Sequence, residues 1–411
     1  MQTDRRILLI TTNFWPEPTG IAVYATDLTL ALQESGCKIT VLTSLPHYPW
    51  WRIPQEFAHL GEGESSFQGV RVLRAKHLVP PAMNAIVRMK FEFSLWWNLR
   101  RVSMSFKSRE FDAIIAYMPT VAAGIVAKNI AEKFKIPFGL IMQDLSGAGA
   151  KQSGLKGGAF ISFVAQVIEG SVLHSANEIA VVSPAMPVVL EKLRIDKNRI
   201  TQILNYSARA IEFVDKASAR AKFGLNDDSF IVIHTGNMGA KQDLDNVINA
   251  ASELTAHKDI RIYLVGHGNQ EAHLKSLCEN RSNIQVLPAV KDEDYSALLS
   301  AADLLLVNER STQMEMSLPS KLTSYLFSQR PVLAAAPQGG ATWNFLEGIA
   351  ILVEAGKPKE LAKAIIDIQG NPKERIRLSA IGLEFAQKNL SVESGHKNYL
   401  DWVRKLLSST V

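Results

Sequence analysis

Residues 302–336, ADLLLVNERSTQMEMSLPSKLTSYLFSQRPVLAAA, contain two short apolar runs with a loop and a helical pattern between them. Each run is continuously apolar rather than alternating, which is typical of a strand buried on both faces of a sheet. Two such strands separated by a helical pattern indicate parallel pairing through a crossover helix. The stretch therefore predicts one strand–helix–strand unit of an α/β sheet.

The same alternation of apolar runs and helical patterns continues through the rest of the chain. The first half contains RILLITT, ITVLTS, VRVLRA, DAIIAYM, FGLIMQD and EIAVVS, and the second half contains FIVIHTGN, IRIYLVG, IQVLPAV, ADLLLVN, PVLAAA and AILVEA. A chain of 411 residues is too long for one ordinary core. We predict two doubly wound, Rossmann-like α/β domains joined near 206–216, with domains at 1–207 and 208–390 and a C-terminal helix at 391–411 that can pack back on the N-terminal domain.

The composition is that of a soluble globular protein, with 47% apolar and 21% charged residues. No apolar run reaches the roughly 18 residues of a membrane-spanning helix, and the N-terminal apolar run is too short for a secretory signal. We therefore expect a cytoplasmic protein. Cys37 and Cys278 lie far apart without partners at metal-ligand spacing, so we interpret both as packing residues. The net charge of +5 fits an anionic partner without choosing among nucleotides, phospholipids and nucleic acid.

Ligands of open parallel sheets bind beyond the carboxyl ends of the strands, so we expect the functional residues in the loops after the apolar runs. The first loop, TTNFWPEPTG, ends in Gly20 at a helix start, where backbone amides can approach a phosphate. The alternative is that Gly20 only serves the turn. A nicotinamide-type G-x-G-x-x-G is absent from this position.

Two further glycine loops follow strands of the second half. Gly266 and Gly268, in VGHGNQEAHL, form a lone G-x-G, which we interpret as a tight strand-to-helix turn. Gly236 and Gly239, in HTGNMGAKQDL, bracket a loop that leads to Lys241 at the expected start of a helix. Flexible glycines with one cation suit a diphosphate, although a lysine on a helix is often merely solvated.

The Pro-Ser-Lys of residues 319–321 stands between an apolar run and a short helix. Ser320 is a natural N-cap, Pro319 stiffens the approach, and Lys321 adds a cation at the helix start. A cation at that end opposes the helix dipole unless an anion binds there, so the position indicates a bound phosphate. The alternative is an ordinary capped helix with an exposed lysine.

The segment 80–109 interleaves aromatic residues (Phe91, Phe93, Trp96, Trp97) with basic ones (Arg88, Lys90, Arg100, Arg101, Lys107, Arg109). This pattern is typical of a helix lying in an anionic membrane surface, and also of a core helix with a solvated basic face. Nucleic acid is not expected, because no nucleic-acid-binding motif accompanies the patch.

Taken together and in this order, the loops resemble the family 4 retaining glycosyltransferases of GT-B fold. The similarity runs from ILLITTNFWPEPTG through TSLPHYP, VVSPAMPVVL, ILNYS, HTGNMGAKQDL, VGHGNQEAHL and IQVLPAVKDEDYSALLSAADLLLV to LPSKLTSYLFSQRPVLA. The PHYP and LPSK forms are most similar to the branch that contains colanic-acid and fucosamine O-antigen transferases.

The resemblance implies two domains facing each other across a cleft, an N-terminal domain for the acceptor and a C-terminal domain for a nucleotide diphosphate sugar. It implies transfer with retention, from a UDP- or GDP-sugar to a lipid-linked or glycan acceptor, with no metal and no other cofactor. The implied donor-binding residues are Gly20, Gly236, Asn237, Gly239, Leu287, Pro288, Glu315, Ser320 and Ser324, with Lys241 and Lys321 neutralising the diphosphate.

The sequence departs from the family pattern at three of these positions. The two usual glutamates fall on Met316 and Ser324, so Glu315 would have to replace the first and a hydroxyl the second. The arginine often found beside the phosphate lysine falls on Asn237. These losses leave open a non-catalytic scaffold or sugar-nucleotide sensor, and also an epimerase of the same fold.

The acceptor side is expected after the strands of the first half. In MQDLSG, Gln143 and Asp144 occupy the position near the anomeric carbon, where Asp144 could orient the attacking hydroxyl or simply cap a helix. Tyr24, His47 and Tyr48 are further acceptor candidates. The sequence thus predicts a cytoplasmic glycosyltransferase, peripheral on the inner face of the cell membrane if 80–109 binds lipid, that builds a bacterial surface polysaccharide.

Overall fold

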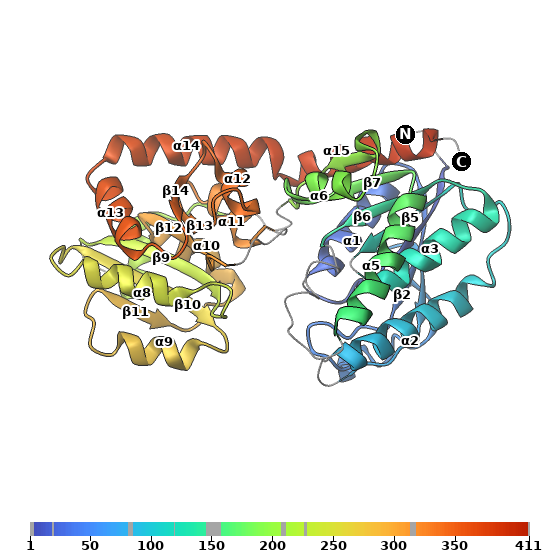
Figure 1. Cartoon of the computed structure of the whole chain (residues 1–411), viewed down its shortest axis with the longest axis horizontal. Helices are drawn as coiled ribbons and strands as arrows, with labels where there is room; N and C mark the ends of the chain where they lie inside the picture. The colour runs from blue at the N-terminus through green and yellow to red at the C-terminus, as the bar shows by residue number, and fades with distance from the viewer. Residues whose placement is uncertain are drawn as a thin grey trace. The chain divides into compact units, whose positions relative to one another are not determined.

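The computed structural model divides the protein into two compact units (Figure 1), namely Met1–Ala208 together with Gly395–Val411, and Arg209–Ser394. They are called unit 1 and unit 2 here. The structure describes residues 4–18, 20–80, 85–118, 120–144, 158–206, 211–225, 228–312 and 318–409, with side chains of the α5 helix described from 166 onward.

Unit 1 is built on an eight-stranded sheet with the order β3-β4-β2-β1-β5-β6-β7-β8. Every neighbouring pair is parallel except β3 with β4. The central strand β1 pairs Leu8 with Thr40 on one side and with Ile114 on the other. The strands are β1 Arg6–Ile10, β2 Lys38–Ser44, β3 Gly63–Phe67, β4 Val70–Ala75, β5 Ala113–Met118, β6 Phe138–Met142, β7 Glu178–Val181 and β8 Ile200–Gln202.

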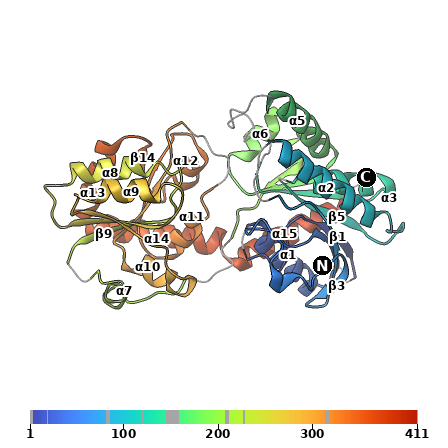
Figure 2. The ribbon, with the colours of Figure 1, turned by 90° about the horizontal axis from the view of Figure 1, so that it is seen from below.

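Helices cover the sheet of unit 1, with α2, α3 and α5 adjacent to one another (Figures 1 and 2). The last helix, α15, packs against β6 so closely that a Cβ on Gly139 would lie 2.7 Å from the Trp402 ring. The helices are α1 Ile21–Glu34, α2 Ala85–Ser103, α3 Val121–Phe134, α5 Gly158–Ser175, α6 Met186–Lys192 and α15 Val392–Ser408, with 3-10 turns at Gln55–Phe57 and Lys197–Arg199.

One carboxylate fixes the start of α15 within unit 1. Asp27 on α1 accepts hydrogen bonds from Tyr206 Oη at 2.5 Å and His396 Nε2 at 2.6 Å. Gly395 is required beside them, because a Cβ there would lie 2.1 Å from the Tyr206 ring. From its amphipathic sequence, the C-terminal helix could pack on either domain. The structure assigns its residues from Gly395 onward to unit 1.

Unit 2 is built on a six-stranded, all-parallel sheet with the order β11-β10-β9-β12-β13-β14. This is the Rossmann order. From β9 the strands are added toward one edge of the sheet up to β11, and from β12 they are added toward the other edge, so the strand order reverses between β9 and β12. The strands are β9 Phe230–Asn237, β10 Ile260–His267, β11 Ile284–Leu287, β12 Leu304–Asn308, β13 Val332–Ala336 and β14 Ile351–Glu354.

Helices lie on both faces of this sheet. α8, α9 and α13 form one layer (Figure 2), and their apolar faces close a core with the strands around Val247, Leu274 and Leu361. The helices are α7 Lys216–Lys222, α8 Leu244–Glu253, α9 Glu271–Cys278, α10 Tyr295–Ala301, α11 Lys321–Phe327, α12 Ala341–Leu346, α13 Pro358–Gln369 and α14 Pro372–Asn389, with a 3-10 turn at Asp292–Asp294.

The twelve apolar runs named from the sequence all form strands. Two strands escaped the sequence analysis, β3 with the sequence GESSF and β8 with the sequence ITQ. Both stand at the edges of the sheet of unit 1. An edge strand needs no continuous apolar run, because one side and one face can meet water.

Candidate active site

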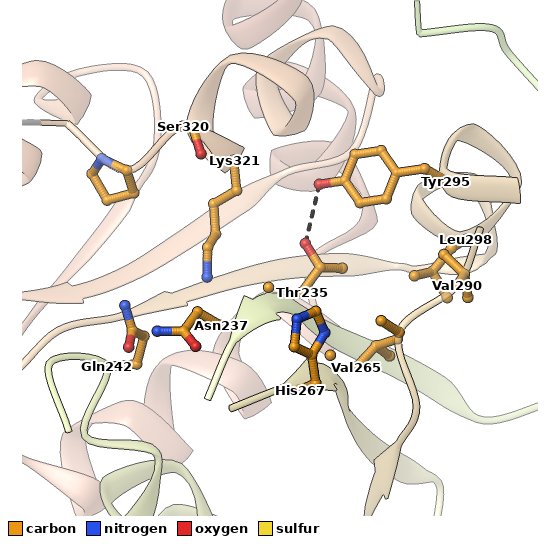
Figure 3. A pocket seen from close by; sticks show the side chains of 14 residues that line it. Thr235, Asn237, Gln242, Val265, His267, Val290, Tyr295, Leu298, Ser320 and Lys321 are labelled. Atoms are coloured by element: carbon orange, nitrogen blue, oxygen red, sulfur yellow. Dashed lines mark hydrogen bonds between the residues drawn. The ribbon is translucent and has the colours of Figure 1, made fainter. Parts of the chain in front are cut away.

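A pocket of about 380 Å³ opens at the carboxyl ends of the strands of unit 2 (Figure 3). It lies around the end of β9, beside the point where the strand order reverses, which is where open α/β sheets bind their ligands. The described residues that line it are Thr235, Gly236, Asn237, Gln242, Val265, Gly266, His267, Ala289, Val290, Tyr295, Leu298, Pro319, Ser320 and Lys321.

Two glycines at the end of β10 allow close approach of the last residues of β9 and of the loop that follows it. Gly266 has a φ of 155°, and a Cβ there would lie 1.9 Å from the Gly236 carbonyl oxygen. A Cβ on Gly268 would lie 2.4 Å from the Met238 carbonyl oxygen. The lone G-x-G is thus more than the tight turn expected from the sequence, because its two glycines leave room for the carbonyl groups of Gly236 and Met238.

Lys321 supplies the cation of the pocket. Its ammonium Nζ lies 3.1 Å from His234 Nε2, and Figure 3 shows the side chain extending from the start of α11 toward Asn237. Burial lowers the pKa of Lys321 from 10.5 to about 7, and the negative charge of Glu309 partly opposes this shift. A bound anion would favour the charged ammonium.

Hydroxyl groups form the other wall of the pocket. The Thr235 backbone N–H donates to Tyr325 Oη at 2.8 Å, and the Thr235 hydroxyl lies 3.1 Å from Tyr295 Oη (Figure 3). Burial raises the pKa of Tyr325, so this phenol stays protonated. Tyr295 and Leu298 come from the first turns of α10, which the sequence analysis did not single out.

Four of the donor residues named from the sequence meet in this pocket, namely Gly236, Asn237, Ser320 and Lys321. Gly239 lies next to it, and its N–H donates to the side chain of Gln242 at 3.2 Å. Beyond β11, the residues that line the pocket are Ala289 and Val290, two positions after the expected Leu287 and Pro288. Glu315 falls outside the described residues.

Two local expectations differ from the structure. Lys241 lies in an exposed turn rather than at a helix start, because α8 begins at Leu244. Ser320 occupies the N-cap position of α11, but its side chain makes no capping hydrogen bond, since its φ of −57° and ψ of −27° are already helical. Ser324 lies within α11, and neither it nor Lys241 is among the described residues that line the pocket.

In unit 1, a buried carboxylate organises the loops after β1 and β2. Glu17 Oε1 accepts the backbone N–H groups of His47 at 2.7 Å and Tyr48 at 2.8 Å, while Oε2 accepts from Asn13 Nδ2 at 2.7 Å. Burial raises the pKa of Glu17, and the three donated hydrogen bonds oppose that rise. This arrangement brings Tyr48 against Gly20, where a Cβ would lie 3.4 Å from the Tyr48 ring.

The other acceptor candidates of unit 1 are engaged within the fold. His47 is 3% exposed and its Nδ1 lies 3.1 Å from the Leu45 carbonyl oxygen. Gln143 exchanges two amide hydrogen bonds with Asn205, at 3.1 and 2.8 Å. Tyr24 packs edge-on against Tyr206, with ring centroids 5.9 Å apart.

Asp144 is exposed at the end of the described segment that follows β6. It is therefore placed at the carboxyl edge of the unit 1 sheet, as the motif MQD predicted. Among the acceptor candidates, Tyr48 and Asp144 are the exposed ones.

Sequence reasoning missed Glu17 and His234. Each carried a signal, because Glu17 stands between two prolines and His234 interrupts the apolar run FIVIH at its carboxyl end. Among the residues that the structure describes, no group of three or more His, Cys, Asp or Glu side chains could hold a metal ion.

Comparison with known proteins agrees with this architecture. Residues 19–205 match the family described as Glycosyl transferase 4-like domain, and residues 215–384 match Glycosyl transferases group 1. The chain is 26% identical to a protein of Escherichia coli K12 named as a colanic acid biosynthesis glycosyl transferase, WcaI, over 97% of this chain and 100% of that protein.

Solved structures show the same fold. Sucrose-phosphate synthase from Thermosynechococcus elongatus superimposes with a TM-score of 0.73 at 17% identity, covering 98% of this chain and 99% of that one. HepE of Anabaena, in complex with UDP, has a TM-score of 0.70 at 14% identity, covering 97% of this chain and 100% of that one. The chain therefore belongs to the family 4 glycosyltransferases of GT-B fold.

Proposed function

We propose that this glycosyltransferase transfers a sugar, with retention, from a UDP- or GDP-sugar to a lipid-linked or glycan acceptor during synthesis of a bacterial surface polysaccharide. The relative named for colanic acid biosynthesis supports the pathway class, and the UDP complex of HepE supports a nucleotide donor. The observation that carries the proposal is the pocket of unit 2, which combines a glycine loop, a pocket cation and an apolar wall.

Each wall of this pocket suits one part of a nucleotide sugar. Val265, Ala289, Val290 and Leu298 offer an apolar surface for a base. Gly236 leaves its backbone open to close approach by a phosphate, and Lys321 supplies positive charge beside it. In this arrangement the diphosphate lies between the end of β9 and the start of α11.

The reaction follows from stabilising the departing diphosphate. As the bond between the anomeric carbon and the diphosphate oxygen breaks, negative charge grows on that oxygen, and the Lys321 ammonium lowers its energy. The acceptor oxygen bonds to the anomeric carbon on the same face, and its proton passes to the departing diphosphate oxygen. Lys241 assists from the neighbouring loop, and Asp144 orients the acceptor hydroxyl. No metal takes part in this scheme.

The test is incubation of the pure protein with UDP- and GDP-sugars and a lipid-linked acceptor, with release of nucleotide diphosphate measured. Acceptor-dependent release together with a retained anomeric configuration, established by NMR of the product, is the expected result. A sensor would bind a nucleotide sugar in calorimetry without turnover, and an epimerase would convert the donor without acceptor. Either outcome would contradict transferase function.

We also propose that α2 attaches the enzyme to an anionic membrane surface. One face of α2 is buried through Phe91, Leu95 and Leu99, whereas the opposite side exposes Phe93 by 62% and Trp97 by 51%. The exposed Ile86 and Met89 continue this stripe at helical spacing. No helix among the described residues is long and apolar enough to cross a membrane.

The same helix also exposes basic side chains. Arg88, Lys90 and Arg100 are exposed beside the apolar stripe. Cations next to exposed aromatic side chains are typical of helices that lie in the headgroup region, where each cation adds about 1 kcal/mol near an anionic surface. The stripe and the cations thus favour a lipid surface over bulk water.

Replacing both Phe93 and Trp97 by serine is expected to lower binding to phosphatidylglycerol-containing vesicles by about tenfold or more, because burial of two aromatic side chains is lost. Vesicle flotation measures this. The control is Ile376→Ser on α14, which removes an even more exposed apolar side chain, 71% exposed, from unit 2. Equal flotation of the double variant and the control would contradict the attachment.

A further inference from the structure

His234 is a buried polar residue at the carboxyl end of β9, where the surrounding sequence is apolar. Its side chain is fully buried, with 0% exposure, and it stands one residue before the pocket-lining Thr235. A buried imidazole that served only packing would cost free energy relative to an apolar side chain. The contacts of its two nitrogens show what it does instead.

The hydrogen bonds of His234 define its tautomer. Nδ1 lies 3.0 Å from the Leu306 carbonyl oxygen, which can only accept, so Nδ1 carries the proton. Burial and the nearby Lys321 charge lower the pKa of His234 well below its usual range, so the ring is neutral. Nε2 therefore has a free lone pair, and it accepts a hydrogen bond from Lys321 Nζ at 3.1 Å.

We propose that His234 is a positioning residue that holds the Lys321 ammonium at the diphosphate subsite by accepting one of its three hydrogen bonds. This inference rests on the proposed function, because it assumes that the pocket takes a nucleotide diphosphate. The chain of contacts runs from Leu306 on β12, through the ring, to the ammonium. It fixes one end of a flexible side chain to the sheet.

The surrounding geometry leaves the rest of the ammonium available to an anion. Gly236 has no side chain, and a Cβ there would already lie 3.4 Å from both Cε and Nζ of Lys321. Among the described residues, His234 is the hydrogen-bond partner of Lys321 Nζ, and an ammonium has three N–H donors, so two remain there for phosphate oxygens. Glu309 is the charged neighbour that favours the protonated form, and His234 itself contributes no charge.

Two polar variants of His234 separate positioning from packing. In His234→Asn, the side-chain amide can replace Nδ1 as donor to Leu306, but it is too short to replace Nε2. In His234→Gln, the longer side chain can place an oxygen near the Nε2 position and keep an acceptor for Lys321. A purely structural role predicts equal effects of the two variants on binding of UDP and GDP.

We expect His234→Asn to weaken binding of UDP or GDP by about tenfold or more, which is the loss typical of a hydrogen bond to a charged group, while His234→Gln stays within about threefold of the wild type. The full-length chain is used, affinities come from calorimetry, and thermal melting confirms folding. If His234→Asn does not fold, His234→Leu replaces it in the same comparison. The proposal would be overturned if His234→Gln bound UDP or GDP with the same affinity as His234→Asn, or as His234→Leu where that variant is used.

A double-mutant cycle with Lys321→Met tests whether the effect passes through Lys321. In the Lys321→Met background, substituting His234 is expected to leave diphosphate affinity unchanged, and additive losses would overturn the proposal. The pH at which nucleotide-sugar binding weakens should also fall in His234→Asn, because an ammonium without its acceptor deprotonates more easily. Wild-type protein that binds neither UDP nor GDP would instead overturn the proposed function itself.

Discussion

Replacing Lys321 by methionine is expected to lower kcat/KM for the nucleotide sugar by about 10²- to 10³-fold, the loss typical of removing one preorganised group that stabilises transition-state charge. Among the described residues, Lys321 is the lysine that lines the pocket, and its ammonium lies 3.1 Å from Nε2 of His234 on β9. Methionine has a similar length and fits a partly buried site, so the change removes charge with little change in volume. Steady-state rates of diphosphate release measure the effect.

The same variant should abolish a pH dependence that the wild type shows. Lys321 has a pKa of about 7 without ligand, so it is charged below pH 7 and neutral above it. The donor diphosphate keeps its charge across this range, and it binds the ammonium form. Donor affinity should therefore fall as the pH rises, by about fivefold from pH 7 to pH 8, until the higher pKa of the bound state is reached.

Lys275→Met is the matched control, because this lysine is exposed on α9 and pairs with Glu271 at 2.7 Å. It should leave kcat/KM and its pH profile unchanged. Lys241→Met tests the second cation of the proposal, and a rise in KM is expected from it. A Lys321→Met enzyme with wild-type turnover would contradict the assignment of the pocket.

Replacing Gly266 by alanine is expected to destabilise unit 2 by about 3 kcal/mol or more, through a clash that no side-chain rotation can relieve. The new Cβ would lie 1.9 Å from the Gly236 carbonyl oxygen, so the paired ends of β10 and β9 would have to separate. The same movement displaces Gly236 and Asn237 from the pocket. Donor binding should therefore be lost in whatever fraction of the protein still folds.

Chemical denaturation and nucleotide calorimetry measure the two effects. Gly370→Ala is the control within unit 2, because Gly370 has an ordinary φ of −72° and a Cβ there would lie 3.6 Å from the Ile366 carbonyl oxygen, an ordinary contact distance. It should change the free energy of unfolding by less than about 1 kcal/mol. Comparable behaviour of the two alanine variants would show that the loop after β9 is free to move away from β10.

The loss of the usual glutamates changes where the donor can be held. Ser324, at the second of these positions, lies within α11 and is not among the described residues that line the pocket, so we expect another side chain to contact the ribose of the proposed donor. Tyr295 lines the pocket and its hydroxyl is oriented by Thr235 at 3.1 Å. Among the described hydroxyl groups that line the pocket, we expect that of Tyr295 to contact a sugar or ribose oxygen.

The sequence by itself predicted the fold. It also predicted that the candidate functional residues follow the carboxyl ends of the strands. Continuous apolar runs such as FIVIH and DLLLV can only be strands buried on both faces, and glycines directly after them predict loops that approach a phosphate. Local pattern was therefore sufficient to single out Gly236 and Lys321 as candidates for contact with a phosphate, whereas the expectation that the second domain holds the nucleotide came from the resemblance to the family. These features depend on neighbours in the chain.

Only the tertiary structure decided how these residues are used. Nothing near His234 in the sequence shows that Leu306 and Lys321 meet its two nitrogens, because those contacts join residues 72 and 87 positions apart. The two glycines of the G-x-G at the end of β10 are likewise required by the close approach of Gly236 on β9 and of Met238 directly after β9. Hydrogen bonding and steric exclusion act between atoms that are close in space, so the roles of Lys321, His234 and Gly266 become fixed only when the parallel strands bring them together.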